Sequence, residues 1–258
     1  MDSHAQQAGD TIVTAGWVHV QALHTSNAIH TDLQPTVVGH LLGVPDSFDS
    51  NGTSSSLTKV DTLGLNLTHF FADHWSVDFA GGIPARVSVY GGGTVSPGGT
   101  AGPLLSVNLG DPSVNPLGSA RQWSPALMLA YHFAPMPRLQ PFVDVGFTYT
   151  WFTQARLNRA FENQLNSGVG REMALAAGKP GSTSVSIDPH PLFAPVVGAG
   201  VPWRFAEHWL VVGSAGFAPF ATHTRVDIRA SDGSLLSTSK VRIDVDALVS
   251  GVLLGYVF

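Results

Sequence analysis

The sequence has no cysteine, little charge and no long apolar run. The absence of cysteine from 258 residues excludes a disulfide framework and thiolate metal sites. Only 12% of the residues are charged, roughly half the share that is usual in soluble domains. No apolar stretch approaches the ~18–20 residues that a transmembrane helix needs. The net charge of −5 and the scattered Lys and Arg residues argue against a nucleic-acid partner.

Apolar residues nevertheless make up 44% of the chain, and many of them alternate with small or polar residues. From Val143 to Trp151, bulky apolar side chains occupy the odd positions, and Asp, Gly or Thr occupies the even positions. Such alternation gives a strand two different faces. A closed β-barrel in lipid requires this pattern, since closure pairs every backbone group and leaves no edge in hydrocarbon.

Alternating segments recur along the chain and predict an all-β fold. We expect an eight-stranded antiparallel transmembrane β-barrel that forms a single domain over residues 1–258. The predicted strands are 11–20, 59–71, 75–90, 122–133, 141–153, 185–204, 209–229 and 238–258. Pro84 interrupts the third of them, which predicts a bulge or a kink.

The predicted connections alternate between long and short. Residues 1–10 form an N-terminal tail, and the long loops cover about 21–58, 91–121 and 154–184, with a possible helical piece over 157–177. Outer-membrane barrels have short periplasmic turns and longer external loops. Aromatic residues flank the short turns, as an interfacial girdle would. We therefore expect the three long loops to be external.

Both ends of the chain bear on export. The first five residues have neither a basic n-region nor an apolar h-region, so we expect a mature exported protein whose signal peptide is absent and to which an initiator Met was added. The last five residues are LGYVF. The terminal Phe258, with Tyr256 two positions before it, is similar to the signal that the barrel-assembly machinery recognises in outer-membrane proteins.

Two internal segments resemble the OmpW family. Residues 123–133, WSPALMLAYHF, are similar to that family's fourth strand, and residues 138–152, RLQPFVDVGFTYTWF, are similar to its fifth strand. The fifth-strand pattern reads Arg-x-x-Pro-Tyr-Val-x-x-Gly-x-x-Tyr-Thr-x-Phe. Residues 241–244 also match the start of the last strand. The sequence thus resembles OmpW/AlkL-like outer-membrane proteins along nearly the whole chain, specifically in these strands and loosely in the loops.

The resemblance implies a Gram-negative outer-membrane barrel that is not an enzyme and passes small hydrophobic molecules. In the family, an apolar residue on strand three and a Trp early on strand six narrow the channel, and an ungapped alignment maps these to Ala80 and Phe193. The predicted inward faces add small channel-lining residues, namely Gly146, Thr148, Thr150, Ser214, Gly216 and Ala218. The expected partners are hydrophobic solutes, outer-membrane lipid and lipopolysaccharide.

The physics of a small barrel limits how solutes move. Eight strands enclose a lumen that side chains nearly fill, so a wide aqueous pore is not expected. An apolar solute gains roughly 25 cal/mol per Å² of surface removed from water. We expect the long loops to form an apolar funnel that leads to a side exit. Prolines lack a ladder donor, and Pro84, or Pro189, Pro191 and Pro195, could open the wall between strands three and four or near strand six.

Two other classes of function remain open. A barrel enzyme acting on outer-membrane lipid would need a His–Ser pair, and the candidates are His223 with Ser214 and His132 with Ser124. Neither pair has an evident acid to orient its base. A structural or adhesion barrel would instead bind a partner through its loops. The histidines lack a fixed ligand spacing, and the Gly-rich runs lack a following Lys-Ser/Thr, so we expect no metal and no cofactor.

Overall fold

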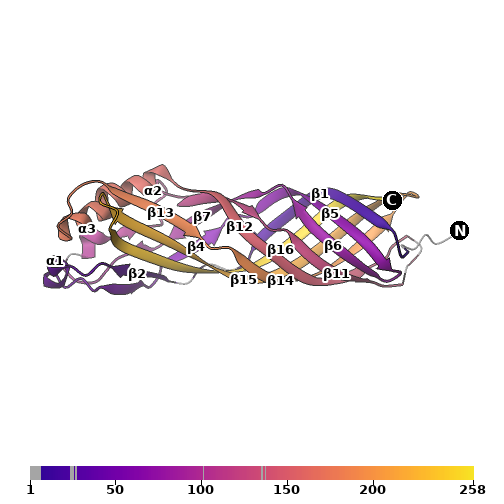
Figure 1. Cartoon of the computed structure of the whole chain (residues 1–258), viewed down its shortest axis with the longest axis horizontal. Coiled ribbons are helices and arrows are strands. Elements are labelled where there is room, and N and C mark those ends of the chain that lie inside the picture. The colour runs from indigo at the N-terminus through magenta and orange to yellow at the C-terminus, as the bar shows by residue number, and fades with distance from the viewer. Residues whose placement is uncertain (1–6, 24–25, 27, 101, 135, 137) are drawn as a thin grey trace.

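Alternating strands form the wall of a long cylinder in the computed structural model (Figure 1). The structure describes residues 7–258 except 24–25, 27, 101, 135 and 137, so residues 1–6 of the predicted N-terminal tail lie outside the described part. The main sheet is a closed eight-stranded antiparallel β-barrel. Pairing of the first and last strands, from Ile12 opposite Val257 to Ala22 opposite Ala247, completes the wall. The predicted fold class is confirmed.

Some barrel strands are continuous and others are broken. The continuous ones are β1 (Thr11–Ala22), β5 (Val60–Ala72), β12 (Phe142–Leu157), β15 (Trp209–Ala230) and β16 (Leu235–Val257). The broken ones are β6 (Trp75–Gly82) with β7 (Ala85–Gly92), β10 (Gly118–Trp123) with β11 (Ala126–His132), and β13 (Thr183–Pro189) with β14 (Leu192–Arg204). The breaks fall at Pro84, Pro125 and Pro191, since proline cannot donate to a ladder.

The two ends of the cylinder differ (Figure 1). The C-terminus and the start of β1 lie at one end, which we call the proximal end, together with the short turns. Aromatic side chains gather there as predicted. The rings of Trp75 and Tyr131 lie 5.1 Å apart, and those of Trp209 and Tyr256 also lie 5.1 Å apart. The proximal end therefore carries an aromatic girdle.

The opposite end, which we call the distal end, carries regular structure where the sequence predicts long loops. Residues 21–58 contain β2 (Ile29–Leu33), α1 (Val37–Leu41), β3 (Ser47–Ser50) and β4 (Ser54–Leu57). Residues 91–121 contain β8 (Thr94–Val95), η1 (Gly102–Leu105), β9 (Val107–Asn108) and β10. Residues 154–184 contain α2 (Arg159–Gln164), the π-helix η2 (Leu165–Gly170) and α3 (Arg171–Ala176). In the part of the chain that the structure describes, no helix is long and apolar enough to cross a membrane.

The outer wall of the barrel is apolar. Along β12, Val143, Val145, Phe147 and Tyr149 are exposed, whereas the small residues between them face inward. Bulky apolar side chains thus lie on the outside and small side chains on the inside, which is the opposite of a soluble protein. This arrangement is stable when the outer surface meets hydrocarbon. The residues that line any solute path therefore lie on the inward positions.

Candidate functional site

The barrel encloses a cavity of 580 Å³, here called the barrel cavity. Most of the predicted channel residues lie along its wall, namely Ala80, Thr148, Thr150, Ser214, Gly216 and Ala218. Gly146 is buried and points inward on β12, but a Cβ at this position would overlap the carbonyl oxygen of Leu127. Gly146 therefore allows close packing of neighbouring strands rather than lining the cavity.

Phe193 lies on the outside of the barrel, contrary to the expectation from the ungapped alignment. Its side chain is 67% exposed, and its ring stacks on the outward-facing Phe147 with centroids 5.1 Å apart. Because successive strand residues face opposite sides, an alignment error of one residue exchanges the two faces. The adjacent Ala194, which is 1% exposed, takes the inward position.

A second cavity, of 190 Å³, lies within the distal end, and we call it the distal cavity. Aliphatic and aromatic side chains line most of it, including Ile29, Leu109, Leu117, Phe161, Val226 and Ile228. A third cavity of 290 Å³ between α1 and α3 shares lining residues Leu33, Leu105 and Met173 with it. The distal end thus contains apolar space that extends towards its tip, where the side chains of Val37 and Leu41 are exposed.

An apolar cluster, here called the waist, separates the distal cavity from the barrel cavity. The buried Ala247 packs there against Val20, Ala22, Leu57 and Val241. Val20 and Ala247 line the barrel cavity, whereas Leu57 and Val241 line the distal cavity. The waist therefore lies between the two cavities, and its residues contribute to the lining of both.

A packed floor closes the proximal end of the barrel. Phe70 is fully buried and packs in one cluster with Ile12, Leu210 and Val257. The rings of Phe70 and His132 lie 4.5 Å apart. These side chains fill the space between the barrel cavity and the proximal end.

The structure shows the surroundings of His132, the histidine of the candidate catalytic pair His132 and Ser124. His132 Nε2 lies 2.9 Å from the hydroxyl of Ser76 rather than near Ser124, whose hydroxyl lies 2.9 Å from that of Thr150. His132 Nδ1 is buried and has no hydrogen-bond partner, so no carboxylate orients the imidazole as an acyl-transfer triad requires. Among the residues described, no group of three or more His, Cys, Asp or Glu side chains could hold a metal ion.

The barrel wall has a gap beside the barrel cavity. The ladder between the third and fourth barrel strands pairs Ala80 with Ala126 and, further along, Ala85 with Gln122. Between these pairs, the described residues 81–84 form no ladder pair with residues 123–125, although Gly81, Gly82 and Trp123 each pair with the strand on their other side. Residues from both segments line the barrel cavity, and the side chain of Ile83 is 55% exposed. Ile83 thus lies at a place where the wall has no backbone pairing and borders both the barrel cavity and the outer surface.

A second unpaired stretch lies near the sixth barrel strand, as the prolines predicted. The ladder between β14 and β15 begins at Val197 opposite Phe217, and that between β13 and β15 ends at Pro189 opposite Thr224. Between these pairs, the described residues of the two strands form no further ladder pair with each other, and the backbone hydrogen bond from His190 to His223 narrows the unpaired stretch. Only Val196 and Ala218 from this stretch line the barrel cavity. The stretch between the third and fourth strands thus contributes more residues to the lining of the barrel cavity than this second stretch does.

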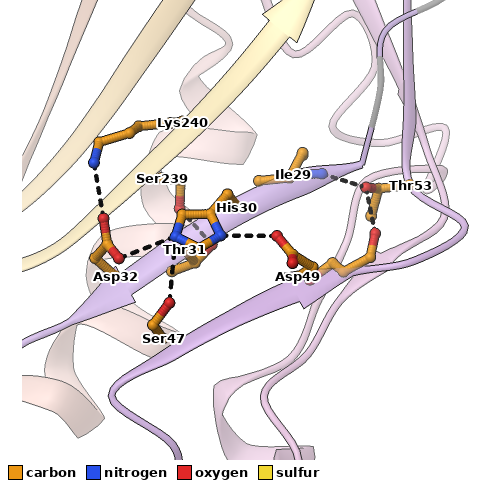
Figure 2. Close-up of polar contacts among 10 residues, drawn as sticks. Ile29, His30, Thr31, Asp32, Ser47, Asp49, Thr53, Ser239 and Lys240 are labelled. Atoms are coloured by element: carbon orange, nitrogen blue, oxygen red, sulfur yellow. Dashed lines mark hydrogen bonds and ion pairs between the residues drawn. The ribbon is translucent and has the colours of Figure 1, made fainter.

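A polar network fastens the added distal strands to the barrel (Figure 2). The Lys240 ammonium on β16 lies 2.9 Å from a carboxylate oxygen of Asp32 on β2. The imidazole of His30 lies 3.1 Å from Asp32 and 2.7 Å from Asp49 on β3. The hydrogen bond with Asp49 raises the pKa of His30, and the hydrogen bond from Lys240 lowers the pKa of Asp32. This network holds one wall of the distal cavity in place.

Comparison with known proteins places this fold in a family. The OmpW family profile matches residues 7–258. The outer membrane protein AlkL of Ectopseudomonas oleovorans is 25% identical over 203 residues, which cover 79% of this chain and 68% of AlkL. The crystal structure of OprG from Pseudomonas aeruginosa superposes with a TM-score of 0.70 at 22% identity, covering 100% of this chain and 99% of OprG.

The solid-state NMR structure of AlkL in lipid bilayers gives a TM-score of 0.53 at 20% identity and covers 100% of this chain and 94% of that one. These structural neighbours are outer-membrane barrels, and the location of this protein is accordingly the Gram-negative outer membrane. The apolar outer wall of the barrel suits this location. With a profile match that spans the described chain, the protein belongs to the OmpW family of outer-membrane β-barrels.

Proposed function

We propose that this barrel lets small apolar molecules enter the cell passively and releases them sideways into the membrane. A solute would enter the distal cavity, pass the waist into the barrel cavity, and leave between residues 81–84 and 123–125. One observation supports the proposal: residues of the unpaired wall stretch line the barrel cavity, while Phe70 and its neighbours pack at the proximal end.

The composition of the path suits apolar solutes. Aliphatic side chains line most of the distal cavity, and small residues such as Gly216 and Ala218 leave room in the barrel cavity. A solute that buries roughly 150 Å² of apolar surface there gains on the order of 4 kcal/mol relative to water. The lipid acyl chains outside the gap offer the solute a similar gain in free energy. Apolar molecules can therefore move down their gradient without an energy source.

The fold closes the alternative route through the proximal end. A polar solute such as a sugar would need a hydrated channel past the waist and past the floor, both of which consist largely of packed apolar side chains. Burial of its hydroxyl groups without partners would be unfavourable. Selectivity for apolar over polar solutes then follows from desolvation rather than from a dedicated binding group.

The C-terminal residues support a further part of the proposal. Tyr256 and Phe258 lie in edge-to-face contact at the proximal end, with ring centroids 4.9 Å apart. Phe258 is 71% exposed, so an assembly factor could reach it. We retain Tyr256 and Phe258 as the signal for the barrel-assembly machinery.

Uptake measurements test the proposed function. Gram-negative cells that produce the protein should take up a medium-chain alkane faster than cells that lack it. The same purified barrel in liposomes should not speed swelling in a sugar solution. Passage of sugar without faster alkane uptake would overturn the proposal in favour of an aqueous pore.

A further inference from the structure

Three arginines lie side by side on neighbouring strands at the distal edge of the apolar wall. Arg86 on β7 is directly opposite Arg121 on β10. On the other side of β10, Arg156 of β12 is opposite Ser119, two residues from Arg121. Residues at such direct and diagonal positions lie within roughly 5–8 Å at their Cβ atoms. We call Arg86, Arg121 and Arg156 the arginine cluster.

The arginine cluster faces outward. Its members alternate with Val87, Ala120 and Ala155, which line the distal cavity. Since alternate residues of a strand face opposite sides, the guanidinium groups lie on the outer surface. Two of the three arginines are exposed, and Arg121 between them is half-buried.

Among the residues that the structure describes, no anion neutralises the arginine cluster. In the described part of the chain, none of its three guanidinium groups forms an ion pair or a hydrogen bond, and Arg121 Nε is buried without a partner. Like charges directly opposite each other destabilise a sheet. A bound anion would remove this repulsion. Phosphate suits the site because the guanidinium fork binds its oxygens in pairs.

The depth of the arginine cluster matches that of lipid headgroups. Towards the apolar wall, Trp123 follows Arg121 by two residues on β10 and is opposite Trp151 of β12. The rings of the two tryptophans stack with centroids 5.8 Å apart. Trp123 Nε1 donates a hydrogen bond to Thr153, with a distance of 3.1 Å. Tryptophans that have one apolar face and one bonded N–H are typical of the membrane interface. The arginines thus lie next to the region of the lipid acyl chains, on its distal side.

We infer that the arginine cluster binds the phosphate groups of an outer-leaflet lipid, the lipid A part of lipopolysaccharide. The stacked tryptophans favour this occupant over free phosphate, because they offer an apolar surface for acyl chains directly below the arginines. The bound lipid would lie beside the wall gap, since Ala85 and Gln122, which border the gap, are adjacent to Arg86 and Arg121. This inference does not depend on solute passage.

Binding of lipid A to the detergent-solubilised barrel, followed by native mass spectrometry, tests the inference. The variant R86Q/R121Q/R156Q should bind lipid A at least about tenfold more weakly than wild type, because it loses the charge-assisted hydrogen bonds. The charge-matched variant R138Q/R159Q/R171Q, changed elsewhere on the surface, should bind as wild type does. The variant R86K/R121K/R156K keeps the charge and should retain a large part of the affinity, which separates lost binding from misfolding.

Two further ligands distinguish the sources of phosphate. Dephosphorylated lipid A and inorganic phosphate should each bind far more weakly than intact lipid A. Unchanged lipid A binding by the folded glutamine variant would overturn the inference. Equal binding of dephosphorylated lipid A would also overturn it, because the phosphates would then be dispensable. Equal binding of inorganic phosphate would overturn it too, because the site would then hold any phosphate. Alkane uptake is not a readout here, so failure of this test leaves the proposed function untouched.

Discussion

The rings of Phe70 on β5 and His132 on β11 lie 4.5 Å apart inside the barrel, and Phe70 has no exposed surface. Phe70 and the residues around it close the barrel cavity on its proximal side. The distal side is separated by a small waist, whereas the proximal side is filled by a bulky aromatic ring and the aliphatic residues around it. The unpaired wall stretch lines the same cavity that Phe70 and its neighbours close on the proximal side.

Truncation of the floor should open a water-filled route. We expect Phe70→Ala to destabilise the barrel by about 3–5 kcal/mol, since it removes a fully buried aromatic side chain. We also expect it to increase ion conductance in planar bilayers. The adjacent Phe71→Ala removes a ring that is 54% exposed and should leave conductance unchanged. Equal conductance of the folded Phe70→Ala variant and the wild type would show that this ring does not close the barrel.

Filling the waist should slow solute passage. Leu57 faces inward at the waist, and the adjacent Ser56 on the same strand is exposed. We expect Leu57→Trp to lower alkane uptake about tenfold, because a close-packed waist has no space for an indole beside a passing solute. Ser56→Trp should have no such effect. Comparable uptake by the two variants, at equal amounts in the outer membrane, would rule out the waist as part of the path.

The distal network should respond to pH through His30. Its folded pKa is raised, chiefly by the hydrogen bond with Asp49. The resulting stabilisation is therefore complete below the ordinary histidine pKa of about 6.5 and is lost as pH rises through the raised value. We expect amide protection factors in β2 and β3 to be higher at about pH 6 than at about pH 8. The effect should be small, since His30 is 42% exposed.

A substitution tests whether His30, rather than another histidine, causes the pH effect. His30→Asn should make the protection factors of β2 and β3 independent of pH over this range, whereas His208→Asn at the proximal end should not. Asp32 and Lys240 face His30 and Asp49 in the same network, and the lowered pKa of Asp32 keeps this carboxylate ionised at both pH values. Retention of the full pH effect in His30→Asn would assign it to another group.

Strand alternation, the alternating lengths of the connections and the family resemblance together predicted the barrel. The period-2 pattern of β12 and the proline at position 84 identified a wall strand and a break in the third one. The pattern also indicated most of the cavity lining, because inward positions of a closed barrel must be small. It failed at Phe193, where an alignment without gaps exchanged the two faces of β14.

The rest of the site depends on contacts between distant segments. The waist joins Val20, Leu57, Val241 and Ala247 from three strands, and no local pattern marks them as neighbours. The arginine cluster likewise appears only when the register places Arg86 opposite Arg121. Residues 21–58 have a polar, loop-like composition, yet β2 and β4 in this segment pair with β16 and β7. Backbone pairing, rather than local composition, determined their structure.

A reversible lock across the wall gap tests the central claim most directly. The chain has no cysteine, so Gly81→Cys with Pro125→Cys would introduce one pair at the positions next to the last ladder pair, Ala80 with Ala126. The control pair Phe79→Cys with Leu127→Cys joins residues that are already opposite each other. We predict that oxidation lowers alkane uptake only in the first variant and that a reductant restores it. Undiminished uptake through the locked barrel would contradict a sideways exit at this gap.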